Sequence, residues 1–406
     1  MSSPRKTILF TALEPSGDAH AASVIAHLVA NYPEVEAVAW GGPRMEAAGA
    51  RMLGRTADDG VMGIVSMNKV LEVKALHDTI VAWVREHPVA VHMPVDSPSA
   101  NYPLCARLKP LGARVVNLVA PQLWAWAPWR IGKVRRLSDV LLCLLPFEEE
   151  WFRSRGVVAK YVGHPVLSKP LDDAVIDAQA ARLPAGAPRI VLLPGSRSSE
   201  VRANTALLVE SFALIRARHA NAQAVVVASN AANAAHFVQA VGGKLPAAVT
   251  MITASAEATI EGAIRWSELA LAVSGTVSLD CTRQATPMIG VYRANRLAVC
   301  IAKIVIRSPH LLLPNIIAGR TIVPEFVPYA GRAATIAQHA LAILDEPSRR
   351  AQMIADLQAV AAIFTDRDPA PICAETVARA ARGEVITNET LDEIVRDVST
   401  PRTQKA

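Results

Sequence analysis

The chain has 406 residues, of which 51% are hydrophobic and 19% are charged, so it has enough apolar material for two domains and too little charge for wholesale disorder. The net charge of +6 suits an anionic small substrate or an anionic membrane surface, and the lack of a basic block with interleaved aromatic residues argues against nucleic acid. The five cysteines lie far apart without a Cys-x-x-Cys pair, which predicts buried thiols in a reducing cytosol rather than disulfides or metal ligands. No apolar stretch is long enough for a transmembrane helix, so we expect a protein that is soluble or rests on a membrane surface.

Short apolar runs alternate with helical patterns in the first half of the chain, which is typical of βαβ units in a parallel sheet. A turn at residues 14–18 separates the first expected strand from the first expected helix. Asp96 directly follows a later strand and lies between two prolines. Ligands of an open α/β sheet gather at the carboxyl ends of its strands, so we interpret Asp96 as the best candidate for a general base. The expected strands of this half are residues 7–12, 36–40, 89–93, 114–118 and 139–144.

Three other residues compete with Asp96 for the role of base, namely Glu14, His20 and His164. His164 stands in a Gly-His-Pro turn, where we interpret it as a structural histidine or as a contact to phosphate or ribose. His20 lies inside the first expected helix, where a solvated histidine is the simpler interpretation. Asp96 therefore remains the preferred candidate.

Two apolar segments are candidates for contact with lipid. Residues 61–65 cluster hydrophobic side chains beside a glycine, and we interpret residues 61–71 as a candidate lipid-facing surface. The alternative is a helix packed on the protein's own sheet, which we favour for residues 76–84. A helix rich in Ile and Val carries Arg296, Lys303 and Arg307, which fits an anionic membrane surface or, equally, a buried helix whose basic side chains reach solvent. The lipid-facing residues of the first segment are Val61, Met62, Ile64 and Val65.

The second half repeats the alternation after a stretch rich in Pro, Ala and Asp at residues 165–188. We expect no strand after about Val305, where helical patterns alone continue. Two βαβ arrays joined by one connector predict an α/β protein with two Rossmann-like doubly wound domains facing a cleft, followed by C-terminal helices. The expected strands are residues 190–193, 224–228, 250–252, 269–273 and 288–291, and the late helices are 332–344, 348–363, 374–382 and 390–398. The expected parts are a first domain 1–166, a connector 167–188, a second domain 189–345, and helices 346–406 that pack back on the first domain or on a partner chain of a homodimer.

The second domain opens with a strand, a glycine turn and a helix N-terminus at residues 189–202. Gly195 lets the backbone turn sharply or approach a ligand closely, and Ser196 follows near the start of the helix. Free N–H groups and the helix dipole favour an anion there, and the planar guanidinium of Arg197 matches phosphate oxygens. We interpret the segment as a diphosphate-binding turn, and the alternative is an ordinary strand-to-helix loop with an exposed arginine.

A second glycine turn, Ser274-Gly275-Thr276, follows the expected strand 269–273 and opens another helix. Its N–H groups and hydroxyls suit phosphate, whereas the alternative is simple capping of the helix by Thr276. Asp280 lies four residues beyond Thr276 on the same helical face, where a carboxylate can accept hydrogen bonds from a sugar. Two anion turns in one domain fit a diphosphate and its attached sugar.

The motifs of the whole chain follow one another in a specific order and spacing. They are Glu14-x-Ser16-Gly17-Asp18, Gly42-Pro43-x-Met45, residues 61–65, Asp96-Ser97-Pro98-x-x-Asn101, Trp124-Ala125-Trp126, residues 145–148, Gly163-His164-Pro165, residues 193–200, Ser274-Gly275-Thr276, Leu313-Pro314-Asn315 and Pro324-Glu325. Together they resemble the lipid-A-disaccharide synthase family, membrane-associated glycosyltransferases with two Rossmann-like domains of the GT-B type. The resemblance implies inverting transfer of 2,3-diacylglucosamine from its UDP derivative to 2,3-diacylglucosamine 1-phosphate, which gives the β-1,6-linked disaccharide of lipid A biosynthesis and UDP. It also implies no cofactor, no required metal, and a cytoplasmic protein held peripherally at the anionic inner membrane.

On the matching positions, the resemblance implies that Asp96 is the general base on the acceptor 6-hydroxyl and that Arg197 holds the diphosphate. Residues 61–65 would belong to the lipid-facing surface. The other implied contacts are Gly195, Ser196, Ser274, Gly275 and Thr276 around the donor phosphates, Glu14, Ser16 and Gly17 across the cleft near those phosphates or the acceptor, and Asn315 and Glu325 near the nucleotide and sugar.

Two other classes of function stay open. Another UDP-sugar enzyme, such as an N-acetylglucosaminyltransferase or an epimerase, shares the broad fold and differs in its acceptor. A non-catalytic nucleotide-sugar-binding or membrane-surface protein would bind UDP without turnover. The chain departs from the family pattern at Ser66, Ser99 and Pro328, which leaves acyl-chain preference and acceptor geometry undetermined.

Overall fold

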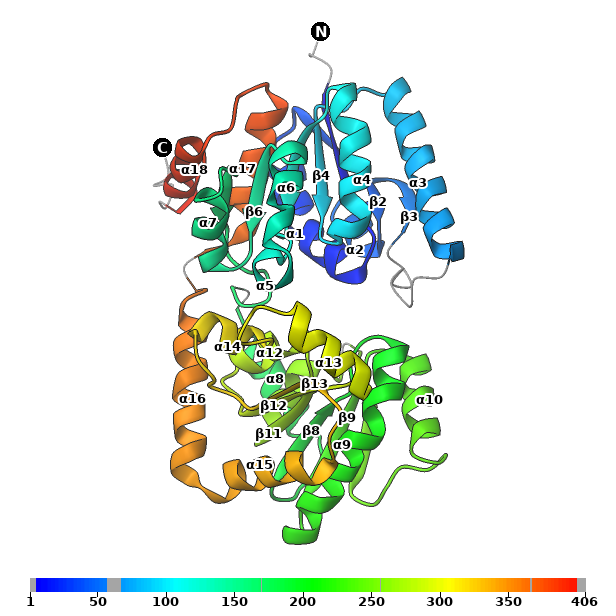
Figure 1. Cartoon of the computed structure of the whole chain (residues 1–406), viewed down its shortest axis with the longest axis vertical. Helices are drawn as coiled ribbons and strands as arrows, with labels where there is room; N and C mark the ends of the chain where they lie inside the picture. The colour runs from blue at the N-terminus through cyan, green and yellow to red at the C-terminus, as the bar shows by residue number, and fades with distance from the viewer. Residues whose placement is uncertain (1–4, 57–66, 169, 256, 366, 400–406) are drawn as a thin grey trace. The chain divides into compact units, whose positions relative to one another are not determined.

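The computed structural model describes residues 5–56, 67–168, 170–255, 257–365 and 367–399. The chain folds into two compact units, and in its described part each unit holds a parallel β-sheet flanked by helices (Figure 1). Unit 1 comprises Met1–Ser168 and Asp366–Ala406, and unit 2 comprises Lys169–Thr365. The chain therefore leaves unit 1 after its sheet is complete and returns to it with its last helices.

Within the described residues, the sheet of unit 1 has seven strands in the order β3-β2-β1-β4-β5-β6-β7, and all neighbours pair in parallel. The central strands are continuous apolar runs, as a strand covered by helices on both faces requires. The order of the strands reverses between β1 and β4, and ligands of such sheets bind at the carboxyl ends beside that reversal. The strands are β1 (Lys6–Ala12), β2 (Val35–Gly41), β3 (Arg51–Arg55), β4 (Val91–Val95), β5 (Arg114–Leu118), β6 (Val140–Cys143) and β7 (Ala159–Tyr161).

The described sheet of unit 2 has six strands in the order β10-β9-β8-β11-β12-β13, also parallel throughout. Its order reverses between β8 and β11. Both sheets follow the strand order of a Rossmann fold, which confirms the expectation of two doubly wound domains with C-terminal helices. The strands are β8 (Arg189–Leu193), β9 (Gln223–Ala228), β10 (Val249–Thr253), β11 (Leu269–Val273), β12 (Met288–Arg293) and β13 (Glu325–Tyr329).

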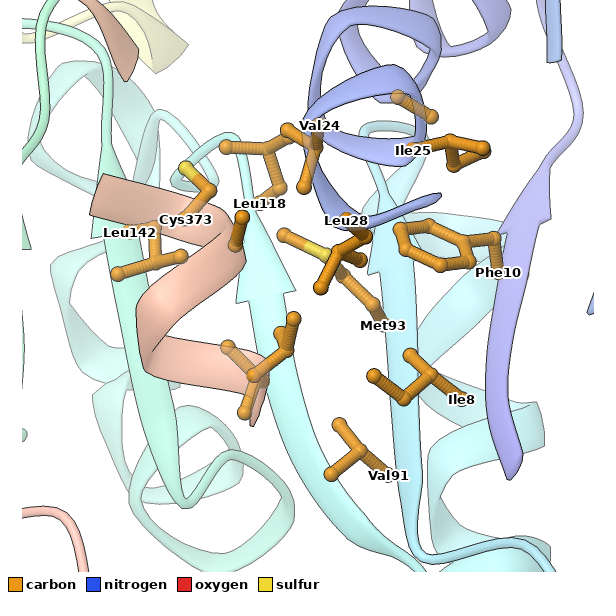
Figure 2. Packing of buried hydrophobic residues seen from close by; sticks show 14 of the residues in the cluster. Ile8, Phe10, Val24, Ile25, Leu28, Val91, Met93, Leu118, Leu142 and Cys373 are labelled. Carbon is orange, nitrogen blue, oxygen red and sulfur yellow. The ribbon is translucent and has the colours of Figure 1, made fainter. Parts of the chain in front are cut away.

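The core of unit 1 fixes the helix that follows β1 (Figure 2). Alternate residues of the central strands pack against α1 (Pro15–Asn31) and α17 (Pro369–Ala381) on one face of the sheet. Leu9, which lies between two of them in β1, packs with α3 (Met67–Glu86) on the opposite face. The labelled residues are Ile8, Phe10, Val91, Met93, Leu118 and Leu142 from the strands, Val24, Ile25 and Leu28 from α1, and Cys373 from α17.

The division of the helices between the units differs from the expected boundaries. α8, which falls inside the expected connector, packs against α11 in unit 2. The late helices are divided between the units: α15 and α16 belong to unit 2, and α17 and α18 belong to unit 1. The other helices of unit 1 are α2 (Pro43–Ala47), α4 (Pro98–Leu108), α5 (Leu123–Trp126), α6 (Ile131–Leu137), α7 (Pro146–Arg153) and α18 (Asn388–Ser399). Those of unit 2 are α8 (Asp173–Ala180), α9 (Ser198–Arg218), α10 (Ala231–Ala240), α11 (Ile260–Trp266), α12 (Val277–Arg283), α13 (Arg296–Val305), α14 (Leu313–Ala318), α15 (Ala333–Asp345) and α16 (Pro347–Ala362).

The expectation that no strand follows Val305 is wrong, because β13 pairs with β12 at the edge of the sheet of unit 2. Its residues are half-buried throughout and include Pro328, so no continuous apolar run marks this strand in the sequence. A proline is tolerated there because an edge strand has one side without a ladder of hydrogen bonds.

Candidate functional site

The candidate base lies where the sheet of unit 1 reverses its order. β1 and β4 are parallel neighbours, and their last residues, Ala12 and Val95, stand opposite each other. Asp96 and Ser16 therefore follow two adjacent strands at the same edge. The Ser16 hydroxyl donates a 3.0 Å hydrogen bond to Oδ2 of Asp96, and the N–H of Ser97 donates a 2.7 Å bond to Oδ1. Two donors thus fix the orientation of this carboxylate.

Gly17 explains how α1 comes close enough for that contact. A Cβ at Gly17 would lie 3.0 Å from the carbonyl oxygen of Val95 and 3.1 Å from Cβ of Ala12. A larger residue would push the first turn of α1, and Ser16 with it, away from the end of β4. The sequence predicted Gly17 as a substrate contact, and the structure gives it a packing role beside the candidate base.

The competing candidates for the base also lie in unit 1. Glu14 is the buried N-cap residue of α1. The rings of His20 and His164 meet edge to face, with centroids 6.0 Å apart. Burial lowers the pKa of His20, although the charge of Asp96 opposes this shift, and burial lowers the pKa of His164 to about 3. Burial therefore favours the neutral form of both rings, and His20 is half-buried in α1.

The backbone at the candidate base is strained. Asp96 and Ser97 both adopt the left-handed conformation, with φ angles of 56° and 45°. This region costs a residue other than glycine about 1–2 kcal/mol. The buried amide of Asn101 donates hydrogen bonds of 2.7 Å to the carbonyl oxygen of Asp96 and 3.3 Å to that of Val95. Strain that a buried side chain maintains is typical of functional sites.

In unit 2 the two glycine turns lie side by side, because they follow the neighbouring strands β8 and β11. Gly195 has a φ of 108°, and a Cβ there would lie 2.6 Å from Oε2 of Glu200. Arg197 is the N-cap residue of α9, and its side chain is 52% exposed. Its Nη1 donates a 2.8 Å hydrogen bond to Oε1 of Glu200.

Glu200 fills part of the expected anion site with its own carboxylate. Its Oε2 accepts the N–H of Ser196 at 3.2 Å and the N–H of Arg197 at 3.3 Å. The sequence predicted that N–H groups of this turn bind phosphate, and in this conformation these two bind a buried glutamate instead. The signal was a glutamate at the third helical position, from which the carboxylate reaches back to the N–H of the N-cap residue Arg197. The guanidinium of Arg197 and the rest of the helix N-terminus remain the groups suited to phosphate.

Asn233 is a second residue that sequence reasoning missed. It is 1% exposed in α10, and its Nδ2 donates a 2.8 Å hydrogen bond to the carbonyl oxygen of Ser196. Its Oδ1 accepts a 3.0 Å bond from the Ser198 hydroxyl. Asn233 therefore holds the glycine turn from the side, and no local sequence signal marked it.

The second turn leaves Gly275 and Thr276 exposed after the end of β11. Thr276 is the N-cap residue of α12, but its side chain makes no capping bond, so simple capping by Thr276 is wrong. The hydroxyl of Ser278 bonds the carbonyl oxygen of Gly275 at 2.8 Å instead. Ser274 is tied to β12 through its N–H, which donates to the carbonyl oxygen of Val291.

Asp280 is a mostly buried carboxyl group in α12, 3.8 Å from Nη2 of Arg283. Burial raises the pKa of Asp280 to about 7, although the charge of Arg283 opposes the shift. A carboxyl group that is partly protonated at neutral pH both donates and accepts hydrogen bonds, which suits a sugar hydroxyl. Among the described residues, no three His, Cys, Asp or Glu side chains are grouped as metal ligands.

Asn315 and Glu325 of unit 2 are joined by a hydrogen bond. The buried amide of Asn315 accepts two backbone N–H groups, and its Nδ2 donates to the carbonyl oxygen of Val323 and to Oε2 of Glu325. The Glu325 carboxylate also accepts the N–H groups of Leu311 and Leu312. Because protein groups use every hydrogen-bonding position of the Asn315 amide, this residue holds a loop in this conformation, which differs from the ligand contact expected for it.

Of the two candidate lipid surfaces, the structure describes α13 but not residues 61–65. Outside the described residues lie Ser66 and the expected lipid-facing side chains Val61, Met62, Ile64 and Val65. The structure describes α13 at residues 296–305, and none of these residues is buried. The alternative of a buried helix is therefore wrong. Leu297 and Ile304 of this helix are 70% and 84% exposed. Across the described residues, no helix has both the length and the apolarity to cross a membrane.

Two Rossmann-type units, with polar groups gathered at the strand ends of each, define the class of protein. Solved structures with a similar fold include S. aureus MnaA with UDP, at a TM-score of 0.65 and 10% identity over 94% of this chain and 98% of that chain. A UDP-GlcNAc 2-epimerase from Neisseria meningitidis bound to UDP-GlcNAc matches at 0.54 and 10%, over 92% and 100%. A glycosyltransferase from Rickettsia africae matches at 0.51 and 11%, over 97% and 100%. The chain therefore has the GT-B architecture shared by glycosyltransferases and epimerases.

Sequence comparison identifies the family within this class. The family model described as Lipid-A-disaccharide synthetase matches residues 8–366. A lipid-A-disaccharide synthase from Anaeromyxobacter dehalogenans (strain 2CP-1 / ATCC BAA-258) is 34% identical over 89% of this chain and 94% of the relative, and one from Pseudomonas aeruginosa (strain UCBPP-PA14) is 29% identical over 85% and 91%. The chain belongs to the lipid-A-disaccharide synthase family. It is an enzyme with that activity, a glycosyltransferase of lipid A biosynthesis, as the resemblance of its motifs implied.

Proposed function

We propose that the enzyme transfers 2,3-diacylglucosamine from its UDP derivative to 2,3-diacylglucosamine 1-phosphate, with inversion at the anomeric carbon, and that Asp96 is the general base. The observation that supports this role is the Asp96 carboxylate, which Ser16 and the N–H of Ser97 hold at the end of β4. A carboxylate held in one orientation takes the proton of the acceptor 6-hydroxyl while that oxygen attacks the anomeric carbon. UDP leaves from the opposite face of the sugar.

The departing UDP gains negative charge in the transition state, so the donor needs positive charge near its phosphates. Arg197 supplies a half-exposed guanidinium at the N-terminus of α9, and the dipole of this 21-residue helix adds a partial positive charge there. Glu200 holds the guanidinium through its Oε1. The proposal also gives residues 274–276 a contact to the phosphates and Asp280 a contact to the donor sugar, which the neighbouring positions of β8 and β11 support.

Both proposed substrates carry acyl chains, so the proposal includes peripheral association with an anionic membrane on its cytoplasmic side. The support is α13, whose exposed residues Leu297, Ile301 and Ile304 recur at helical spacing and form an apolar face. Arg296 and Lys303 belong to the same helix. Apolar side chains of such a helix insert among acyl chains while basic side chains bind anionic headgroups.

A homodimer belongs to the same proposal. Unit 1 is built from two separate segments of the chain, because α17 and α18 return to it after unit 2 is complete. Helices that join a core from the far end of the chain can be supplied by a second copy. Light scattering in detergent tests this, since a dimer has about twice the 43.3 kDa of the chain, and a mass of one chain would contradict it.

Product analysis tests the reaction itself. The enzyme is incubated in detergent micelles with UDP-2,3-diacylglucosamine and radiolabelled 2,3-diacylglucosamine 1-phosphate, and we expect a labelled disaccharide and one UDP for each disaccharide formed. A parallel reaction with N-acetylglucosamine 1-phosphate, a water-soluble acceptor, is expected to give no product. Transfer to the water-soluble acceptor alone, epimerisation of the donor, or UDP binding without transfer to either acceptor would overturn the proposed substrates.

A further inference from the structure

A chain of hydrogen bonds between buried side chains connects the core of unit 1 with the backbone of Asp96. Thr11 in β1, His92 in β4 and Asn101 in α4 are each no more than 1% exposed. The Thr11 hydroxyl lies 2.9 Å from Nε2 of His92 and 2.9 Å from Oδ1 of Asn101. Polar groups in a core cost free energy unless they are paired, and a fully paired set fixes one arrangement of the chain.

The hydrogen bonds of Asn101 determine the donor and acceptor in each of the other hydrogen bonds. Asn101 uses its two amide hydrogens on two backbone carbonyl oxygens, one of them that of Asp96, so its Oδ1 accepts. The Thr11 hydroxyl donates to that oxygen and accepts from Nε2–H of His92. Nδ1 of His92 then carries no proton and faces Sγ of Cys105 at 3.9 Å. Burial lowers the pKa of His92 to about 3, which keeps the ring neutral, as this assignment requires.

We propose that Thr11, His92 and Asn101 are positioning residues that hold the left-handed turn at Asp96, and so aim its carboxylate at the acceptor hydroxyl. This inference rests on the proposed role of Asp96 as general base. Without the amide of Asn101, the turn relaxes to an ordinary conformation, because two successive left-handed residues are unfavourable. The carboxylate then loses its contacts to Ser16 and to the N–H of Ser97. A displacement of about 1 Å lowers a rate by on the order of 100-fold.

Two substitutions of Thr11 test the inference. Thr11→Val removes the hydroxyl at nearly constant volume and leaves Nε2–H of His92 and Oδ1 of Asn101 unpaired, whereas Thr11→Ser keeps the hydroxyl. We expect Thr11→Val to lower kcat by about 10- to 100-fold with the donor KM within about twofold. Thr11→Ser is expected to keep kcat within about threefold of wild type. Asn101→Ala repeats the test from the other end if Thr11→Val does not fold.

Thr376→Val is the matched control. It also removes a buried hydroxyl from unit 1, one that bonds the carbonyl oxygen of Ile372 in its own helix at 2.7 Å. We expect it to lower the melting temperature without lowering kcat. Equal losses of kcat in Thr11→Val and Thr376→Val would overturn the inference, because both would then reflect a weakened core.

Asp96→Asn separates this inference from the proposed base. If the network acts through Asp96, the double variant Thr11→Val/Asp96→Asn is no slower than Asp96→Asn alone, because the losses of residues that act as a unit do not multiply. Losses that multiply would overturn the inference. An Asp96→Asn enzyme with wild-type kcat would refute the proposed base, whereas a slow Asp96→Asn enzyme beside a Thr11→Val enzyme with wild-type kcat would refute the positioning role alone.

Discussion

The Ser16 hydroxyl and the Asp96 carboxylate stand 80 positions apart in the sequence and meet in a 3.0 Å hydrogen bond. The parallel pairing of β1 with β4 brings the two residues to one edge of the sheet, and Gly17 lets α1 approach the end of β4. Ser16 is therefore a direct partner of the proposed base. The turn at residues 14–18 therefore contacts the proposed base through Ser16.

Ser16→Ala is expected to lower kcat by about tenfold, because the carboxylate loses one of its two orienting donors and a hydrogen bond to a charged group is worth about 1.5 kcal/mol or more. The measurement is the initial rate of disaccharide formation at saturating substrates. Ser23→Ala in the same helix is the control, since the exposed Ser23 hydroxyl bonds the carbonyl oxygen of His20. A Ser16→Ala enzyme as fast as Ser23→Ala would show that the contact to Asp96 has no catalytic consequence.

Gly195→Ala is expected to destabilise unit 2 by about 1–3 kcal/mol, because its φ of 108° is unfavourable for alanine and the new Cβ would lie 2.6 Å from Oε2 of Glu200. The same distortion moves Arg197, so the Kd for UDP is expected to rise by about tenfold. Urea unfolding and calorimetric titration with UDP measure the two effects. For stability, Gly275→Ala is the matched control, since its Cβ would meet none of the described atoms within 4 Å. The same loss of stability in both variants would contradict the role given to the Gly195 turn.

The central strands could be predicted from the sequence, whereas three of the four edge strands of the described sheets, all but β10, could not. A strand buried on both faces is a continuous apolar run, as residues 190–193 and 269–273 are. β3, β7 and β13 stand at the edges of the two sheets and were missed. β3 and β13 are half-buried or exposed throughout, and neither is a continuous apolar run in the sequence.

The candidate site could be predicted as a set of residues but not as a set of contacts. The glycine turns and Asp96 were predicted because local strand, turn and helix signals mark them. Glu200 was not predicted as part of the turn, although a glutamate at the third helical position commonly reaches back to N–H groups at the helix start. Asn233 acts across 37 positions, and no short-range pattern carries a contact of that kind.

Glu148 is expected to give unit 1 a pH-dependent stability. Its buried carboxyl accepts hydrogen bonds from Nε1 of Trp124 and from the N–H of Leu145, and burial raises its pKa from 4.5 to about 7. A group whose pKa is raised on folding stabilises the fold below its unfolded pKa and loses this contribution as the pH rises through its folded pKa. The free energy of unfolding of the wild type should therefore fall relative to Glu148→Gln between pH 4.5 and pH 7, by up to about 3 kcal/mol.

Urea unfolding of the wild type and Glu148→Gln at about pH 5 and about pH 8 measures this effect. The comparison of two proteins at each pH cancels the other titrating groups. A difference in unfolding free energy that is the same at both pH values would show that the Glu148 carboxyl titrates alike in the folded and unfolded chains.

The double variant Leu297→Ser/Ile304→Ser is expected to bind phosphatidylglycerol vesicles at least about tenfold more weakly than the wild type, because burying one such side chain in an apolar phase is worth about 1.5–3 kcal/mol. Vesicle co-sedimentation measures the binding. Val385→Ser is the control, since Val385 is 72% exposed in unit 1 and lies outside α13. Vesicles of phosphatidylcholine should bind the wild type less, because Arg296 and Lys303 lose their anionic partners. Equal sedimentation of the double variant and the control would exclude α13 as the membrane contact.

The most direct test of the proposed mechanism is the single-turnover rate of disaccharide formation by the wild type and by Asp96→Asn, at saturating donor and acceptor. Asparagine keeps the shape of the side chain but cannot take the proton of the acceptor hydroxyl. The rate is predicted to fall by about 10²- to 10⁴-fold while the Kd for UDP stays unchanged. An Asp96→Asn enzyme that forms disaccharide within about threefold of the wild-type rate would contradict the role of Asp96 as general base.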